Sequence, residues 1–232
     1  MNDYSFIVGG RAIAKERDDA KHVAILRAAV EVMSQYGYHG AQISRIARAA
    51  GVADGTVYLY FKNKEDILVS ILRMAIGRVV QECSRQLAAC QTTDDKLAAL
   101  IRVYFADLGN NPALAMVTQV YLRQVDANIR REIGDIMKPF YSVVDELIVT
   151  GMQEGKFRSK MDRRIARRMI FGTMDETVTA WVLTGSKYSL VSQVDDVVDV
   201  LLHGLVAVNA EENAMSEGSL NHEDSSTHET DV

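Results

Sequence analysis

The residues best suited to do chemistry lie in one stretch near the start of the chain, ISRIARAAGVADGTVYLYF at positions 43–61. Thr56, Tyr58 and Tyr60 carry hydroxyl groups, and two lysines follow them. Hydroxyl and ammonium groups at one exposed helix end suit the phosphate oxygens and base edges of a DNA major groove. Packing or solvation would explain each residue alone, but the combination favours contact with DNA.

Small and aliphatic residues in the same stretch predict two short helices joined by a tight turn. Ala47 and Gly51 are small enough for the helices to cross closely, and Ile46 and Val57 are apolar residues that would lock the crossing. Gly55, near the start of the second helix, would let the backbone approach DNA. The pattern is typical of a helix-turn-helix.

No group of residues in the sequence has the pattern of a catalytic site. The segment GMQEGKF at 151–157 is one residue too short for a phosphate-binding loop and has Phe157 where Ser or Thr would hold magnesium. The five histidines lack metal-binding spacing, the two cysteines do not form CxxC, and there is no GxSxG. We therefore expect no enzyme activity, no metal and no cofactor.

The elements that must position the DNA-facing groups are predicted to be helices throughout. Two prolines and fifteen glycines among 232 residues are too few for many strands and tight turns, and apolar residues recur three and four apart. Asn63 followed by Asp66 predicts the cap of a long fourth helix. We expect an all-α fold with helices at 19–37, 43–50, 55–60, 63–90, 95–108, 112–124, 127–154 with a kink at Pro139, 162–184 and 190–208.

The charge distribution divides the chain into a weakly basic head and an acidic tail. Residues 1–64 hold nine basic against six acidic residues, whereas 209–232 hold seven acidic residues and no Lys or Arg. With only two cysteines, no signal sequence and no long apolar run, we expect a cytoplasmic protein outside the membrane. The predicted division is a flexible arm at 1–18, a DNA-binding domain at 19–66, a body at 67–208 and a disordered acidic tail at 209–232.

The head resembles a known family. GVADGTVYLYFKNKEDIL (51–68), preceded by GYHGAQISRIARAA (37–50), resembles the signature of TetR-family repressors. The resemblance implies a TetR-like homodimer with a three-helix DNA-binding head and a body that binds an inducer. One departure is Ala53, because many members have a capping Ser or Thr there. The operator contacts that the resemblance implies are Gln42, Ser44, Arg45, Gly55, Thr56, Tyr58, Tyr60 and Lys64.

The body resembles the FadR-type branch of that family, through AMVTQVYLRQ (115–124) and ARRMIFGTMDETVTAWV (166–182). This branch regulates fatty-acid degradation and responds to long-chain acyl-CoA. The resemblance implies a repressor that long-chain acyl-CoA releases from a palindromic operator.

Apolar side chains on successive helices of the body are typical of an ordinary core, but long helices can also leave a tunnel for an alkyl chain. Arg123, together with the arginines at 163, 164, 167 and 168, would either hold the CoA phosphates or form a solvated face, and Arg123 is also a possible partner for a buried Asp175. The candidate ligand-binding residues are Tyr104, Leu108, Met116, Gln119, Val120, Tyr121, Arg123, Phe140, Phe171, Met174, Asp175 and Val178.

Two other interpretations remain open. A sensor of lipophilic cations, as in drug-efflux control, would have the same head and would use Asp175 or Glu176 to neutralise its ligand. A helical scaffold or enzyme that has lost DNA binding would not retain promoter DNA. For a regulator, we expect two chains to pair through the helices at 162–184 and 190–208, and the effector to act through the long fourth helix.

Overall fold

The computed structural model describes the backbone of residues 5–120 and 127–203, and the side chains of residues 19–120 and 129–203. Every regular element in these segments is a helix, as the sequence predicted. The head consists of α1 (Ser5–Gly40), α2 (Ile43–Ala50) and α3 (Asp54–Tyr60). The body consists of α4 (Lys64–Leu87), α5 (Thr93–Gly109), α6 (Pro112–Gln119), α7 (Ala127–Gln153), α8 (Arg163–Leu183), the 3₁₀ turn η2 (Leu190–Gln193) and α9 (Val194–His203).

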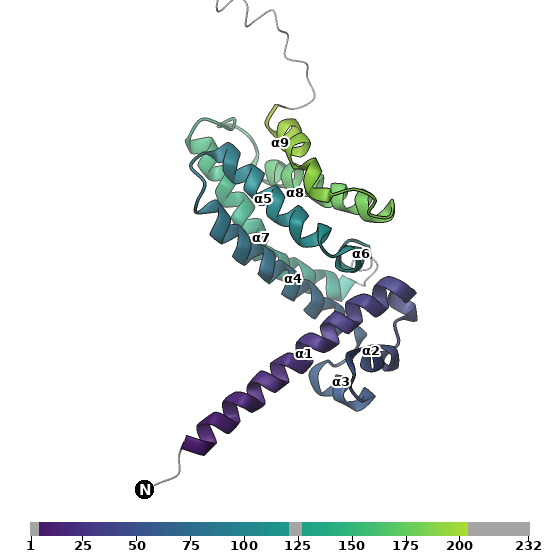
Figure 1. The fold of residues 1–232 in the computed structure, drawn as a ribbon. Coiled ribbons are helices and arrows are strands. Elements are labelled where there is room, and N and C mark those ends of the chain that lie inside the picture. The colour runs from purple at the N-terminus through teal and green to yellow at the C-terminus, as the bar shows by residue number, and fades with distance from the viewer. Residues whose placement is uncertain (1–4, 121–126, 204–232) are drawn as a thin grey trace, which may run out of the picture.

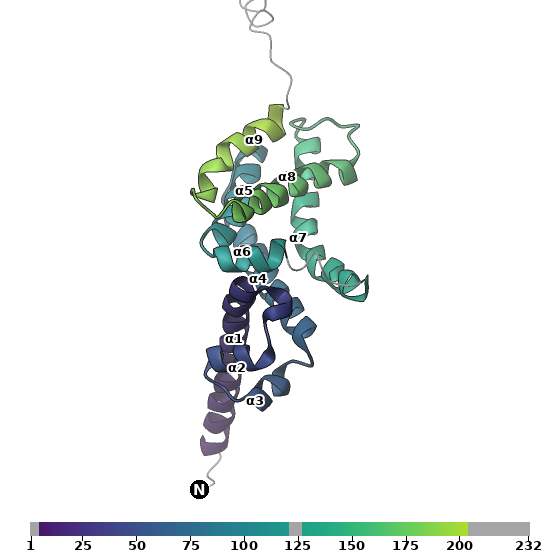
Figure 2. The same ribbon diagram turned by 90° about the vertical axis from the view of Figure 1, so that its right-hand side faces the viewer.

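The head and the body lie at opposite ends of the molecule and are joined by α4 (Figure 1). Within the body, α4 packs along α5 and α7, while α8 and α9 contact α5 as well. The short helix α6 lies at the end of the body that faces the head, where it packs against α1 (Figure 2). Two body helices, α4 and α6, therefore contact the first helix of the head.

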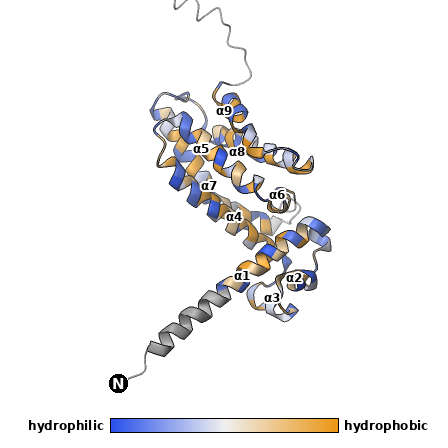
Figure 3. Cartoon of the chain, in the orientation of Figure 1, coloured by the Kyte–Doolittle hydropathy of each residue, from blue (hydrophilic) through white to orange (hydrophobic). Residues whose placement is uncertain are grey.

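The head and the body share one hydrophobic core. The apolar part of α1 lies where this helix meets the body (Figure 3), and Ile25 and Met33 on it are fully buried. The same cluster continues through Ile71 on α4, Phe105 on α5 and Phe140 on α7. Because packed cores resist deformation, a displacement of α4 or α6 will be felt by the head.

Side-chain caps fix where several helices begin. The Asn63 side chain accepts a hydrogen bond from the Asp66 N–H at 2.8 Å, which confirms the predicted cap of α4. Thr92, Asn111 and Asp162 cap α5, α6 and α8 in the same way. Each such cap contributes about 1 kcal/mol to helix stability.

Some helix boundaries differ from those predicted. The first helix begins at Ser5 rather than at residue 19, and Gly37 interrupts it with φ 72° and ψ 166°. The fourth helix ends at Leu87, so Cys90 lies beyond it and is half-buried, whereas Cys83 is fully buried as expected for a core residue. Pro139 lies inside α7.

Several predictions fall outside the described residues. Tyr121 and Arg123 lie in the segment 121–126, and the predicted acidic tail lies within 204–232. Among the helices that the structure describes, none combines the length and the apolar character needed to cross a membrane.

Candidate nucleic-acid interface and ligand cavity

The turn between α2 and α3 has the geometry that the sequence predicted. Ile46 and Ala47 on α2 and Val57 on α3 are fully buried and hold the two helices together. Gly51 ends α2 in the left-handed region, at φ 68° and ψ 31°, where glycine is favoured because it lacks a Cβ atom. Ala53 precedes α3 without any side-chain cap, as expected from its methyl side chain. The two helices form the compact pair that helix-turn-helix proteins use.

Polar side chains surround the outer face of this pair. Gln42, directly before α2, is exposed, as are Ser44 and Arg45 on the helix, and the Arg45 guanidinium lies 4.5 Å from the centre of the Tyr36 ring. On α3, Gly55 and Tyr58 are exposed and Thr56 is half-buried. These groups are accessible to a partner that approaches α3.

Two predicted DNA contacts, which stay predictions, also make contacts within the protein. Tyr60 is half-buried rather than outward, and its ring centre lies 6.1 Å from that of His22 on α1. The Lys64 ammonium donates a hydrogen bond of 2.7 Å to the Tyr38 carbonyl oxygen and lies over the Tyr38 ring at 4.3 Å. The Tyr38 hydroxyl in turn contacts the Glu65 carboxylate at 2.7 Å. These contacts fasten the start of α4 to the end of α1, a role that sequence reasoning missed.

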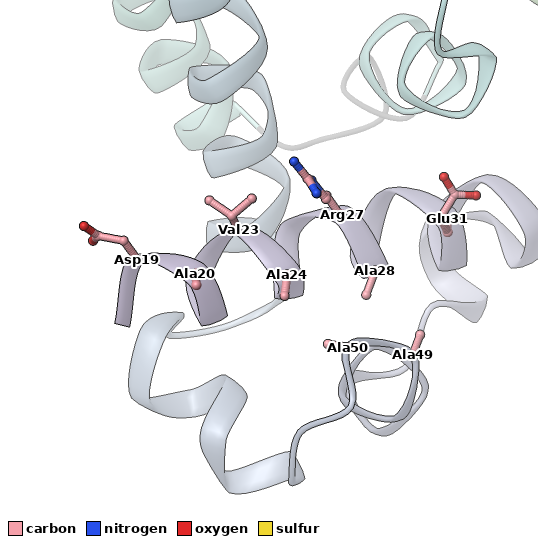
Figure 4. A pocket seen from close by; sticks show the side chains of 9 residues that line it. All are labelled: Asp19, Ala20, Val23, Ala24, Arg27, Ala28, Glu31, Ala49 and Ala50. Carbon is pink, nitrogen blue, oxygen red and sulfur yellow. The ribbon is translucent and has the colours of Figure 1, made fainter. Parts of the chain in front are cut away.

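A wide depression of about 770 Å³ lies between α1 and α2 (Figure 4). Ala24 and Ala28 on α1 point toward Ala49 and Ala50 on α2, and Asp19, Arg27 and Glu31 also belong to the lining. Such a shallow surface offers few polar groups to orient a small molecule. We assign it no ligand.

A second cavity, of about 350 Å³, lies inside the body between helices α4 to α8. Aromatic rings cluster on and behind its wall: the Tyr104 and Phe140 ring centres are 5.7 Å apart, and Phe171 lies 5.8 Å from Phe140. The lining residues are Leu72, Ala75, Ile76, Val79, Tyr104, Asp107, Leu108, Thr118, Gln119, Arg130, Ile133, Met137, Tyr141, Phe171 and Asp175. The cavity is therefore mainly apolar, with a few polar groups.

The polar groups of the cavity are held in place by neighbours. The Gln119 side chain is buried, and its amide nitrogen donates a hydrogen bond to the Tyr104 hydroxyl at 3.0 Å. The Thr179 hydroxyl donates to the side-chain carbonyl oxygen of Gln119 at 3.4 Å. Asp107 accepts two hydrogen bonds from Arg78, at 3.0 and 2.9 Å. Fixed polar groups in an apolar cavity set the orientation of a ligand.

Tyr141 connects the cavity to the basic surface outside it. Burial raises the pKa of its hydroxyl, and the nearby Asp175 carboxylate raises that pKa further. The Arg167 guanidinium lies 5.3 Å from the Tyr141 ring centre and forms an ion pair of 2.6 Å with Asp145. A positive charge thus lies directly behind one wall residue.

Comparison with known proteins identifies the family. The model of the "Bacterial regulatory proteins, tetR family" matches residues 25–71, and that of the "YsiA-like protein, C-terminal region" matches residues 72–204. The chain belongs to the TetR family of bacterial regulatory proteins. Because TetR proteins are transcriptional regulators, this finding confirms that the chain is not an enzyme.

Individual TetR relatives are similar over almost their whole length. The fatty acid metabolism regulator protein of Bacillus subtilis is 43% identical over 185 residues, which cover 80% of this chain and 95% of the relative. A solved structure of FadR from the same organism in complex with stearoyl-CoA has a TM-score of 0.77 and 43% identity, covering 79% of this chain and 99% of that one. FadR from Bacillus halodurans, a regulator of fatty acid degradation, has a TM-score of 0.76 and 44% identity, covering 79% and 98%. The TetR-like all-α fold and the resemblance to FadR-type members are thereby confirmed.

The ligand residues predicted for this TetR protein divide into three groups. Tyr104, Leu108, Gln119, Phe171 and Asp175 line the cavity. Met116 and Val120 are half-buried on or beside α6, and Phe140, Met174 and Val178 are buried in the core behind the wall. The latter five do not border this cavity, because apolar periodicity does not distinguish a side chain that borders a cavity from one that packs behind it, and their part in ligand binding stays a prediction.

The walls contributed by α4 and α7 were missed. Ala75 and Ile76 on α4, and Arg130 and Met137 on α7, line the cavity. The spacing of the apolar residues Ala75, Ile76 and Met137 is also that of a core helix, so the sequence held no separate signal for these three. Of the predicted arginine cluster in this TetR body, Arg167 alone lies beside a wall residue, while positions 163, 164 and 168 are exposed.

Proposed function

We propose that this protein is a repressor of fatty-acid degradation genes that long-chain acyl-CoA releases from its operator. The observation that carries the proposal is an apolar cavity whose walls include α4 and α6, the two body helices that contact the head. The 43% identity to a fatty acid metabolism regulator supports fatty-acid degradation genes as the targets. The related FadR bound to stearoyl-CoA supports long-chain acyl-CoA as the effector.

The chemistry of the cavity suits an acyl thioester. Its aliphatic and aromatic walls exclude water and favour an alkyl chain, at about 0.8 kcal/mol for each buried methylene. The Gln119 amide and the Tyr104 hydroxyl provide polar atoms for a carbonyl group. Arg130, which lines the cavity, and Arg167, which lies beside the wall residue Tyr141 and is paired with Asp145, provide guanidinium groups for the phosphates of CoA.

Helix α4 links effector binding to the head. Leu72, Ala75 and Ile76 border the cavity, while Lys64, at the other end of the helix, is bonded to the end of α1 at Tyr38. A ligand that moves the middle of α4 therefore moves the head with it. Release from DNA requires that acyl-CoA bind more tightly to the conformation that fits the operator poorly.

Dimerisation places two heads on one DNA molecule. Ile165, Met169 and Leu183 on α8 and Val200 on α9 are large apolar side chains exposed on the predicted pairing helices. A second copy of the chain covers them by two-fold symmetry, so that the operator is an inverted repeat. The site of action is the cytoplasm, where bacterial DNA lies.

Not all apolar residues of the segment 190–208, one of the two predicted pairing helices, are available to this interface. Val194 and Val197 are buried within the same chain and belong to its own core. Val191, Val198, Leu201 and Leu202 are half-buried, and Leu205 lies outside the described residues. The dimer face is therefore centred on α8 more than the sequence predicted.

A DNA-binding titration tests the proposal. Labelled promoter fragments are titrated with protein at low ionic strength, and acyl-CoA thioesters of increasing chain length are then added, with free CoA and free fatty acid as separate arms. We expect long-chain acyl-CoA to lower operator affinity by about a hundredfold, which is within the usual range of allosteric coupling. Absence of any shift at low salt would refute DNA binding, and indifference to every thioester would refute the effector alone.

The cavity also supports a second candidate, a sensor of lipophilic cations. Asp175 lines the cavity and carries the negative charge that such a ligand requires, whereas Asp107, also in the lining, is ion-paired with Arg78. Thermal-shift measurements separate the two classes, because a ligand that binds only the folded protein raises its melting temperature. Stabilisation by cations in place of acyl-CoA would favour the second candidate.

A further inference from the structure

The outer surface of α3 carries one prominent side chain that the DNA contacts predicted from the sequence leave out. Leu59 is 83% exposed, the highest value among the large hydrophobic residues that the structure describes as exposed. Tyr58, next to it, is 58% exposed. This exposed leucine lies on the face proposed to bind DNA, where it would meet the partner directly.

The packing of α3 determines which face Leu59 occupies. Val57 and Phe61 are buried and anchor the helix to the head core, and Tyr60 leans toward α1 beside His22. At about 100° per residue, Leu59 lies roughly 200° around the helix from Val57, on the opposite side. It therefore projects away from the protein.

The backbone one turn earlier is equally open. Gly55 precedes Leu59 by four residues and shares its face. A Cβ atom added at Gly55 would meet nothing within 4 Å. A surface that approaches α3 on this side can thus come close to the backbone at Gly55, with Leu59 as the projecting side chain.

The chemistry of leucine restricts what it can read on such a surface. An isobutyl group cannot donate or accept hydrogen bonds, so it gains nothing from the polar edges of guanine, adenine or unmethylated cytosine. Thymine presents a C5 methyl group in the major groove, and apolar side chains contact it there. Resting on the proposed DNA binding, we infer that Leu59 determines sequence specificity by contacting a thymine methyl group in each half-site.

The experiment removes that methyl group and the leucine separately and together. An operator is first selected from random duplexes with the wild-type protein. Each thymine of a half-site is then replaced by deoxyuridine, which lacks only the C5 methyl group. Affinities are measured by fluorescence anisotropy at constant salt for the wild type, Leu59→Ala and Leu59→Met.

We expect one thymine in each half-site at which deoxyuridine weakens wild-type binding by about fourfold, the value of one buried methylene-sized group. Leu59→Ala should bind the normal operator about as weakly as the wild type binds the deoxyuridine operator. Its affinity should not fall further when the same thymine is replaced by deoxyuridine. Leu59→Met, which retains an apolar tip, should keep most of the response. Replacing that thymine by 5-methylcytosine, paired with guanine, should retain more affinity than cytosine.

Lys62→Ala provides the contrasting variant, because Lys62 is exposed two residues beyond α3 and offers a charge for phosphates. It should weaken operator and random DNA alike, lower the salt dependence of binding, and leave the deoxyuridine response intact. Because Leu59 is so exposed, its variants should melt at the wild-type temperature.

The possible failures are distinguishable. If the wild-type protein selects no sequence over random DNA, the proposed DNA-binding function fails. If it selects an operator but no deoxyuridine substitution affects it, or if Leu59→Ala retains the full deoxyuridine response, the assignment of Leu59 alone is overturned. Equal losses of Leu59→Ala on operator and random DNA would likewise overturn it and would indicate contact with the DNA backbone.

Discussion

Filling the cavity from the α4 side should separate effector sensing from DNA binding. Ala75 is buried and borders the cavity of about 350 Å³. Leucine at this position adds three carbon atoms that take the place of about three methylenes of a bound acyl chain. At about 0.8 kcal/mol per methylene, the affinity for acyl-CoA should fall by about 2.4 kcal/mol, or roughly 60-fold. Operator affinity without effector is measured alongside, because a leucine that itself displaced the middle of α4 would move the head as a bound ligand does.

The assay for Ala75→Leu follows operator release by fluorescence anisotropy as long-chain acyl-CoA is added. The concentration for half-release should rise by the same factor as the dissociation constant measured directly. Ala88→Leu is the matched control, because Ala88 is exposed at the end of α4 and does not line the cavity. An unchanged release curve for Ala75→Leu, in a protein that melts normally, would show that the acyl chain does not occupy this cavity.

Three further substitutions test the local structure. Lys64→Ala should lower the free energy of unfolding by about 1.5–3 kcal/mol in urea denaturation, because it removes a charged hydrogen bond, and an unchanged denaturation midpoint would contradict this; the salt dependence of DNA binding, measured on the same variant, tests separately whether Lys64 contacts a phosphate. Ala53→Ser should raise that free energy by about 1 kcal/mol by supplying the missing cap of α3, and an unaltered denaturation midpoint would contradict this. Gly151→Ala should lower the melting temperature because the new Cβ would lie 2.4 Å from the Phe157 ring, whereas Gly134→Ala, which meets nothing within 4 Å, should not.

The head could be predicted from the sequence almost residue by residue, because its signals are local. Gly51 marks a left-handed helix end, and Asn63 caps the next long helix, as observed. The side-chain directions of Tyr60 and Lys64 could not be predicted, because they depend on contacts with His22 and Tyr38 in another helix. Spacing along one helix reports which residues share a face and does not report what covers that face.

The cavity was harder to predict for a related reason. Phe171 and Met174 are three residues apart on α8, yet one borders the cavity and the other lies in the core behind it. Both are apolar and both follow the helical period, so their difference arises only when five helices are placed together. The family resemblance supplied the class of effector, which periodicity alone left open between an acyl chain and a lipophilic cation.

The same connections that carry a signal from the cavity to the head must carry one back. The cavity borders α4 and α6, both of which contact α1, and the bonds of Lys64 and Glu65 to Tyr38 hold the start of α4 to the head. Thermodynamic linkage requires that operator DNA weaken acyl-CoA binding by the same factor by which acyl-CoA weakens operator binding. A variant that loosens the Tyr38 contacts should therefore reduce both factors together, even though this residue touches neither the cavity nor the outer face of α3.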